Sequence, residues 1–257
     1  MAQQWALILG ASSGFGEATA RALAAAGYSI LGVHLDRRAT MPHVAEVIAA
    51  IEGEGQAASY HNINAADAER REAALDAMQE RLAGGRVRVL LHSLAFGTLG
   101  PYVGEGELNP AQMDMTVRVM AHSLVDWTQA LLRRGLMGEG GRIFAMTSSG
   151  SSRVIPSYGA VSAAKAALEA HCRQLAAELA PRGITVNALR GGVTDTPALR
   201  KIPGHERLIE GAQRRNPSGR LTRPEDVARA LVALAGPDTY WVTGNVINVD
   251  GGEEVLA

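Results

Sequence analysis

Tyr158 and Lys165 are the residues whose types and spacing best suit chemistry. They lie seven positions apart at the head of a helical pattern, in IPSYGAVSAAKAALEA. Seven positions make nearly two helical turns, so both side chains are expected on one face. An ammonium nearby favours the ionised form of a phenol, whose unperturbed pKa is about 10. The pair predicts a site in which Tyr158 donates a proton and Lys165 organises it; the alternative is a helix-capping tyrosine and a surface lysine.

A glycine-rich turn near the N-terminus, in LILGASSGFGEA, is the second motif with chemical potential. It follows an apolar run and opens a helical pattern. Glycines permit a tight turn and close approach of the backbone to a pyrophosphate, whose charge is met by amides at the helix N-terminus. The turn therefore predicts a dinucleotide site, with an unliganded turn as the alternative. The residues predicted to contact the cofactor here are Gly10, Ser12, Ser13, Gly14, Phe15 and Gly16.

The elements that position these motifs alternate along the chain. Seven short apolar runs read as strands, with alanine-rich segments of helical periodicity between most of them. The predicted strands are 5–9, 28–35, 56–61, 86–92, 141–147, 183–189 and 245–250. This order predicts an α/β fold, a single-domain Rossmann-type doubly wound parallel sheet of about seven strands with helices on both faces, over residues 1–257. Ligands should gather beyond the carboxyl ends of the strands.

Composition narrows the class of protein. The 257 residues are 47% hydrophobic and carry a formal net charge of −1, so no basic field indicates binding to nucleic acid or to an anionic membrane. Cys172, the only cysteine, excludes a disulfide framework or a cysteine metal site. The histidines His92, His122 and His171 lack metal-ligand spacing, so we expect no metal. The N-terminal apolar run is too short for a signal or membrane segment, which predicts a cytoplasmic protein.

One segment breaks the alternation of strands and helices. Residues 194–223 are polar, punctuated by prolines and longer than an ordinary connection, and such insertions are usually lids or disordered. Because 199–213 retains helical periodicity, we predict a mobile helical lid, with Leu199 and Ile202 contacting substrate. Its basic residues could attract an acidic carrier protein or simply form a solvated face: Arg200, Lys201, Arg207, Arg214, Arg215 and Arg220.

The spacing of GASSGFG resembles that of the short-chain dehydrogenase/reductase family, and the resemblance runs to Asp-Gly-Gly at 250–252. Leu9 departs from it, since the family often has threonine there. The resemblance implies that Asn62 and Ile63 lie near the adenine of a nicotinamide cofactor. Ser93 and Lys165 are also implied as cofactor contacts. Val193 and Thr194 would lie near the carboxamide, although Gly191 replaces the family's usual proline.

The segment VHLDRR should determine the choice between NADH and NADPH. An acidic residue near the adenosine ribose pairs with its hydroxyls, whereas arginine neutralises a 2′-phosphate. The chain offers Asp36, Arg37 and Arg38, and His34 stands where the family's NAD-selecting aspartate usually lies. We therefore favour NADPH over NADH; solvated surface arginines are the alternative.

Departures from the general family pattern resemble its enoyl-acyl-carrier-protein reductase branch. The usual Tyr-x3-Lys is Tyr-x6-Lys, with Val161 in the ordinary tyrosine position. The usual N-N-A-G is HSLAFG, and Met120 aligns with the family's catalytic asparagine. This branch reduces the carbon–carbon double bond of a trans-2-enoyl thioester: hydride goes to the β-carbon and the tyrosine stabilises the enolate oxygen. Phe96 is expected to contact that substrate.

Ser148 lies ten positions before Tyr158, where many enoyl reductases have a second tyrosine. A serine there, with the sequence around 191–221, resembles the more divergent NADPH-dependent type. Ser148 is a candidate catalytic residue that would bond the thioester oxygen; a strand-end hydroxyl bonded to backbone is the alternative.

Two other functions remain open. One is a carbonyl reductase or alcohol dehydrogenase with a displaced tyrosine, and the other is a catalytically silent, NADP-sensing regulatory protein. The resemblance implies a homotetramer and a role in fatty-acid biosynthesis or a more specialised pathway. Acyl chain length, and acyl carrier protein or coenzyme A as carrier, are left open by the sequence.

Overall fold

Seven mostly apolar segments form one parallel sheet in the computed structural model, which describes residues 3–255. The strands are β1 (Gln4–Leu9), β2 (Tyr28–His34), β3 (Ala58–Asn62), β4 (Val87–His92), β5 (Arg142–Thr147), β6 (Thr185–Gly191) and β7 (Val246–Val249). Their spatial order is β3-β2-β1-β4-β5-β6-β7. The predicted doubly wound fold is confirmed, and β3 differs from its predicted range because pairing with β2 begins at Ala58 and ends at Asn62.

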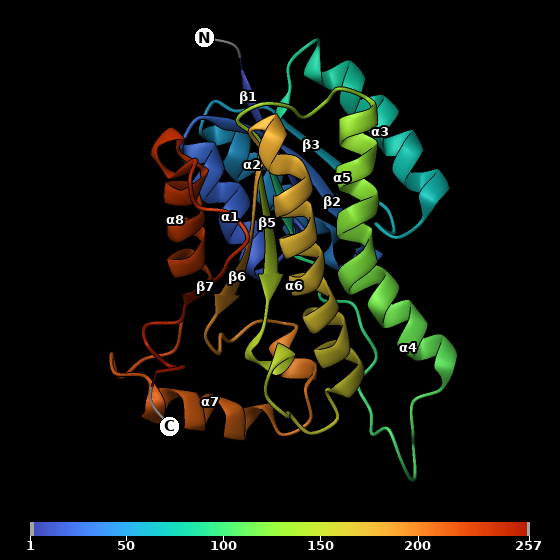
Figure 1. Ribbon diagram of the computed structural model, residues 1–257, viewed down its shortest axis with the longest axis vertical. Helices are drawn as coiled ribbons and strands as arrows, with labels where there is room; N and C mark the ends of the chain where they lie inside the picture. Colours follow the sequence, from blue (N-terminus) through green and yellow to red (C-terminus); the bar gives the residue numbers. More distant parts are fainter. Residues whose placement is uncertain (1–2, 256–257) are drawn as a thin grey trace.

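Eight α-helices connect or follow the strands within the described residues. They are α1 (Gly14–Ala25), α2 (Met41–Gly53), α3 (Ala68–Leu82), α4 (Pro110–Val117), α5 (Ser123–Arg133), α6 (Gly159–Leu179), α7 (His205–Arg215) and α8 (Pro224–Ala235). Figure 1 shows α1 and α8 together on one face of the sheet, with α5 and α6 on the other. None of the helices in residues 3–255 combines the length and apolar character needed to cross a lipid bilayer.

The strands divide their side chains between two cores because successive residues point to opposite faces. In β1, Leu7 belongs to the core covered by α3, α5 and α6, whereas Ile8 belongs to the core covered by α1, α2 and α8. All residues of β1 after Gln4 are buried. Such strands, covered on both faces, explain the continuous apolar runs of the sequence.

The strand order reverses between β1 and β4, the central pair of the sheet. The Leu9 carbonyl accepts a hydrogen bond from the Ser93 amide at 2.8 Å, so the chain leaves both strands at the same point. The carboxyl end of the sheet faces α7, as the arrowhead of β5 shows (Figure 1). This edge is where ligands bind in open parallel sheets.

A π-helical turn, η2 (Arg118–His122), joins α4 to α5 and interrupts an otherwise continuous helix. Such turns contain an extra residue and often lie at functional sites. Here the turn contains Met120, which is buried and packs with Val161 of α6. The π turn therefore places Met120 beside the helix that begins at Tyr158.

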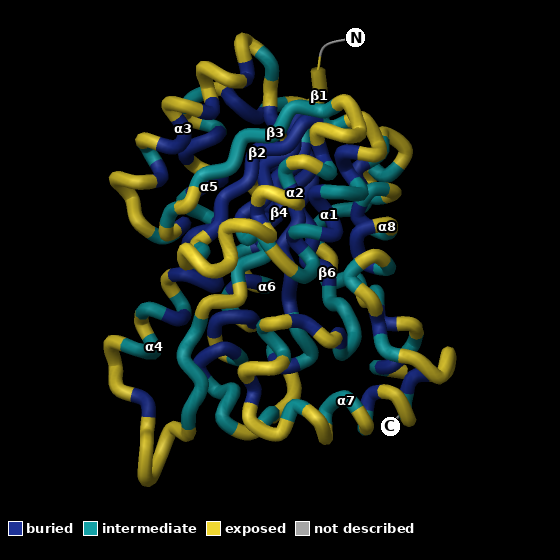
Figure 2. The backbone as a smooth tube through the Cα atoms, turned by 180° about the vertical axis from the view of Figure 1, so that it is seen from behind, coloured by how far each residue is buried: buried dark blue, intermediate teal, exposed yellow. Residues whose placement is uncertain are grey.

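The segment after β6 consists of a short helical turn, η5 (Leu199–Lys201), and α7. The helical character predicted for 199–213 is thus observed. In Figure 2, α7 is largely exposed or half-buried, whereas the central strands are deeply buried and the edge strand β3 is intermediate. The helix lies over the carboxyl end of the sheet (Figure 1).

Candidate active site

The glycine turn after β1 places backbone amides at the start of α1. Gly10 and Gly14 adopt φ values of 91° and 57°, a region that disfavours other residues. A Cβ on Gly16 would collide with the carbonyl of Gly10. Ser13, the N-cap residue, makes no side-chain cap to α1. The Gly10 and Ala11 amides donate to the Val33 carbonyl. The turn is therefore shaped for close approach, and the amides at the start of α1 can meet an anion, which fits the pyrophosphate of a dinucleotide.

Asp36 and Asn62 form a fixed junction beyond β2 and β3. Asn62 Nδ2 donates to the Asp36 carbonyl, and the Asp36 amide donates to Asn62 Oδ1, both at 2.9 Å. One carboxylate oxygen of Asp36 accepts from Thr40 at 2.7 Å, and the other lies 2.9 Å from His34 Nδ1. Burial opposes ionisation of Asp36, but bonds to Ser12, Thr40 and His34 outweigh it and lower its pKa. Asp36 is consequently an anion tied to the glycine turn.

Arg37 and Arg38 follow this junction and are exposed. Neither forms an ion pair with any residue among 3–255. Ile63, the residue after Asn62, packs against the core that α3 and α5 cover. The predicted adenosine residues thus gather at the ends of β2 and β3.

A cavity of about 400 Å³ opens beyond the ends of β4, β5 and β6. Nine of the residues predicted from sequence line it: Phe15, Ser93, Ser148, Tyr158, Lys165, Val193, Thr194, Leu199 and Ile202. The other predicted cofactor residues lie outside this lining, at the glycine turn and the β2–β3 junction. Phe96 differs from prediction, because its side chain is 53% exposed and does not line the cavity. Its neighbours Ala95 and Gly97 line the cavity instead, where the sequence motif predicted Phe96.

Tyr158 stands at the N-cap of α6, after Ser157, whose φ is 59°. Burial raises the pKa of its phenol, and a hydrogen bond with Ser148 acts in the opposite direction. Ser148 also caps a short turn, since its Oγ accepts from the Gly150 amide at 3.1 Å. Both interpretations of Ser148, a catalytic hydroxyl and a strand-end hydroxyl bonded to the backbone, therefore have a basis. Its hydroxyl accepts from the Gly150 amide and also forms a hydrogen bond with the Tyr158 phenol. Tyr158 is a protonated acid at neutral pH.

Lys165 lies two turns into α6 and is 5% exposed. Its Nζ donates to the Met146 carbonyl at 2.7 Å and contacts the Leu94 carbonyl at 3.4 Å. Burial lowers its pKa to about 8, while Cys172 and Glu169 act in the opposite direction. The expected lowering of the phenol pKa by this ammonium is not found: burial dominates at Tyr158, and the lysine is held by main-chain oxygens.

The cavity wall beside Tyr158 is apolar where the family pattern has an amide. Met120 lines the cavity with Val161 and Leu99. His92, the first residue of the HSLAFG motif, is fully buried and its Nε2 lies 2.8 Å from Ser123 Oγ. Burial lowers the pKa of His92 to about 3, so it is a neutral packing residue. Of His92 and Ser93, only Ser93 lines the cavity.

Glu253 is a cavity residue that the sequence motifs did not indicate. It follows Asp-Gly-Gly after β7, is 3% exposed and accepts a hydrogen bond from the Val193 amide at 3.0 Å. Burial raises its pKa; the Val193 amide and Arg215 act in the opposite direction. An acidic residue directly after the Asp-Gly-Gly segment is the only signal that could have drawn attention to it.

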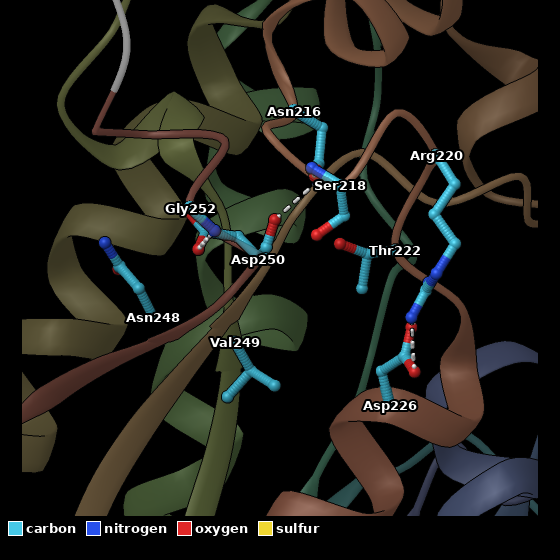
Figure 3. A pocket seen from close by; sticks show the side chains of 10 residues that line it. Asn216, Ser218, Arg220, Thr222, Asp226, Asn248, Val249, Asp250 and Gly252 are labelled. Atoms are coloured by element: carbon cyan, nitrogen blue, oxygen red, sulfur yellow. Dashed lines mark hydrogen bonds and ion pairs between the residues drawn. The ribbon is translucent and has the colours of Figure 1, made fainter.

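A second hollow, of about 320 Å³, lies on the other side of the Asp-Gly-Gly segment (Figure 3). Several of its polar groups pair with one another: Arg220 with Asp226 at 2.6 Å, and Asn216 Nδ2 with the Asp250 carbonyl at 2.8 Å. None of the predicted catalytic or cofactor residues lines it. Within residues 3–255, no three His, Cys, Asp or Glu side chains gather as a metal-ligand set.

Comparisons with known proteins agree with this geometry. Residues 10–254 match the family described as enoyl-(acyl carrier protein) reductase. A 1-cyclohexenylcarbonyl-CoA reductase of Streptomyces collinus is 31% identical over 259 aligned positions, covering 99% of this chain and 88% of the relative. An NADH-dependent enoyl-[acyl-carrier-protein] reductase of Rhizobium meliloti is 33% identical over 191 residues, covering 72% of this chain and 68% of the relative.

Solved structures extend the likeness to three dimensions. A short-chain dehydrogenase of Burkholderia cenocepacia, crystallised with NADP, superposes with a TM-score of 0.85 at 28% identity. The match covers 98% of this chain and 99% of that one. Similar proteins thus include one named for NADH and one crystallised with NADP.

Proposed function

The chain belongs to the short-chain dehydrogenase/reductase family, and on that premise we propose that it reduces the carbon–carbon double bond of an enoyl thioester. The observation that carries this proposal is the cavity wall: Tyr158 and Lys165 face it together, while Met120 occupies the position of the family's catalytic amide. Without that amide, the lysine has no side-chain link to a water relay of the kind expected in a carbonyl-reducing enzyme. The apolar wall suits an acyl chain.

The chain's own residues would act on the thioester oxygen. Burial keeps the Tyr158 hydroxyl protonated, so it can donate a hydrogen bond to that oxygen as negative charge develops there. Ser148, bonded to the phenol, would orient it and can offer a second donor. Lys165 would hold the nicotinamide ribose from the buried floor of the cavity. A bound reduced nicotinamide would supply the hydride.

One assay separates this activity from its rivals. Oxidation of NADPH is followed with a crotonyl thioester and, in parallel, with an acetoacetyl thioester, beside a cofactor-binding titration. Turnover of the crotonyl substrate alone supports enoyl reduction. Turnover of the acetoacetyl substrate alone would identify a carbonyl reductase, and tight cofactor binding without either turnover would identify a silent nucleotide sensor.

NADPH is the cofactor that we propose. Both Asp36 carboxylate oxygens already have partners within the chain, His34 and Thr40, which leaves less capacity to accept from ribose hydroxyls. Arg37 and Arg38 are exposed and unengaged beside them, where a 2′-phosphate would find two guanidinium groups. Competing titrations of NADPH and NADH measure the preference directly.

We also propose an acyl carrier protein as the carrier of the substrate. Three basic side chains of the lid region are already in ion pairs: Arg200 with Asp195, Arg215 with Glu253, and Arg220 with Asp226. A carrier would therefore contact the others, Lys201, Arg207 and Arg214, of which Lys201 lines the cavity. Comparison of crotonyl-acyl-carrier protein with crotonyl-CoA, in wild type and in Arg207→Ala, tests this. A loss confined to the protein-borne substrate supports docking.

A homotetramer is the assembly we propose, on the basis of the family. The small residues along α6 allow close helix contact, and Trp241, just before β7, is 87% exposed. Size-exclusion chromatography with light scattering measures the mass; a monomer at working concentration would contradict this.

A further inference from the structure

Glu253 places a carboxylate where both ends of the lid segment meet. The lid segment, defined here as residues 193–216, leaves β6 at Val193 and returns at the end of α7. Glu253 Oε2 accepts from the Val193 amide at 3.0 Å, and Oε1 lies 3.7 Å from Arg215 Nη2. The first contact holds the outgoing end, and the second attracts the returning end.

The neighbouring backbone supports the same junction. Asn216 donates from Nδ2 to the Asp250 carbonyl at 2.8 Å, which is the dashed contact beside Asp250 in Figure 3. A Cβ on Gly192 would lie only 2.7 Å from Glu253 Oε2, so the carboxylate passes close to the chain where the lid segment leaves β6. The tail after β7 thus contacts the lid segment at both of its ends.

Burial separates this ion pair from the other ion pair of the lid. The side chains of Glu253 and Arg215 are 3% and 36% exposed, whereas those of Arg200 and Asp195 are 66% and 44% exposed. Exposed pairs contribute little because water and salt screen them, but removal of the partner of a buried charge leaves that charge uncompensated. The Glu253 contacts are therefore the ones able to influence the lid position.

We propose that Glu253 is a positioning residue, which fixes both ends of the lid segment and so sets the shape of the substrate cavity. Leu199, Ile202 and Leu208 of this segment line the cavity, so a shift at its ends alters the surface that an acyl chain contacts. The kinetic part of this inference rests on the proposed enoyl reduction, whereas the lid position can be measured without turnover.

Hydrogen exchange and steady-state kinetics on Glu253→Gln test the inference. The amide can still accept from Val193 but no longer attracts Arg215 as an anion. We expect amides of 205–215 to exchange about tenfold faster, the scale of one lost charge-assisted contact. The KM for the crotonyl thioester should rise about fivefold to tenfold with kcat nearly unchanged, because the acyl contacts are lost and the acid is not.

Arg215→Met removes the same ion pair from the other side. It should also raise the exchange rate of 205–215 and the KM for the crotonyl thioester. The double variant should show changes in both quantities no larger than those of either single variant. Glu254→Gln is the matched control: Glu254 is the adjacent acid of the same tail, but it pairs with Arg153 at 3.2 Å instead of the lid segment. It should leave exchange of 205–215 at the wild-type rate.

Wild-type lid exchange in Glu253→Gln would overturn the inference, and so would faster exchange spread equally over the central strands, which indicates a merely structural role. A thioester that is not turned over by wild type contradicts the proposed function alone, because the exchange experiment keeps its meaning. Faster lid exchange with an unchanged KM would remove the link between lid position and substrate.

Discussion

The ammonium of Lys165 is bonded to the Met146 carbonyl at 2.7 Å, so main-chain atoms at the end of β5 hold it. Tyr158 is held differently, at the N-cap of the helix that carries this lysine, with Ser148 as its side-chain partner. The acid and the cation are thus positioned independently. Their roles should separate in variants of each.

Tyr158→Phe should leave NADPH binding nearly intact and reduce turnover by about a hundredfold or more, the scale of a lost general acid. The phenyl ring fills the same space, so the cavity keeps its shape. Stopped-flow turnover and a fluorescence titration of NADPH measure the two effects on one sample. Turnover equal to wild type would remove Tyr158 from the mechanism.

Cofactor affinity should depend on pH through Lys165, because burial lowers the pKa of this lysine from 10.5 to about 8. It carries its charge below that value and loses it as the pH rises through about 8. NADPH binding, titrated from below to above this value, should therefore weaken on the alkaline side. Lys165→Met should bind weakly throughout and lack this dependence; an unchanged affinity in that variant would contradict the ribose contact.

The free energy of unfolding should rise with pH through Lys165, whereas the affinity for NADPH falls. Between the folded pKa of about 8 and the unfolded value of 10.5, the unfolded chain binds more protons at this lysine than the folded one. Its contribution to the free energy of unfolding therefore rises with pH across that window. Urea titrations of wild type and Lys165→Met, compared over the window, should show the rise in wild type only.

The double variant Arg37→Ala with Arg38→Ala should weaken NADPH binding more than NADH binding, since only NADPH carries a 2′-phosphate. The two arginines are exposed and form no ion pairs in residues 3–255, so their removal should leave the fold unchanged. Isothermal titrations with both cofactors give the ratio. Equal losses would place these guanidinium groups away from the ribose.

The segment 199–213 should be mobile without ligand and become ordered over cofactor and substrate. It contains η5 and most of α7, and its residues Leu199, Ile202 and Leu208 line the cavity. Closure would exclude water from the path of the hydride. Hydrogen exchange on the free protein and on its complex with NADPH and an inhibitor compares the two states; strong, equal protection in both would exclude a gate.

The fold could be predicted from sequence because its signals are local. The glycines of the first turn, the seven apolar runs and the Tyr158–Lys165 spacing each depend on a few consecutive residues and the sheet period. The nine cavity residues follow, since they come from the strand ends and from the helices and loops after them, which meet at the carboxyl edge of a parallel sheet.

What could not be predicted depends on partners distant in sequence. The carbonyl partners of Lys165 lie 19 and 71 positions away, and Val193 lies 60 positions from Glu253. Phe96 was assigned by its place in a motif, whereas the local course of the chain turns Ala95 and Gly97 to the cavity and leaves the ring in solvent. The pKa of the Tyr158 phenol depends on its burial, and the seven-residue spacing from Tyr158 to Lys165 gives no information about burial.

The π turn between α4 and α5 sets the direction in which the residues of α5 point. One residue corresponds to about 100° of helical rotation, and the wider π turn absorbs one extra residue, so regular α-helical geometry across Arg118–His122 without a deletion would turn everything beyond it. Leu124, Trp127 and Leu131 of α5, all fully buried, would rotate away from the sheet. The chain at its present length therefore needs the π conformation here, and the register of a distant core depends on the same five residues that place Met120 in the cavity.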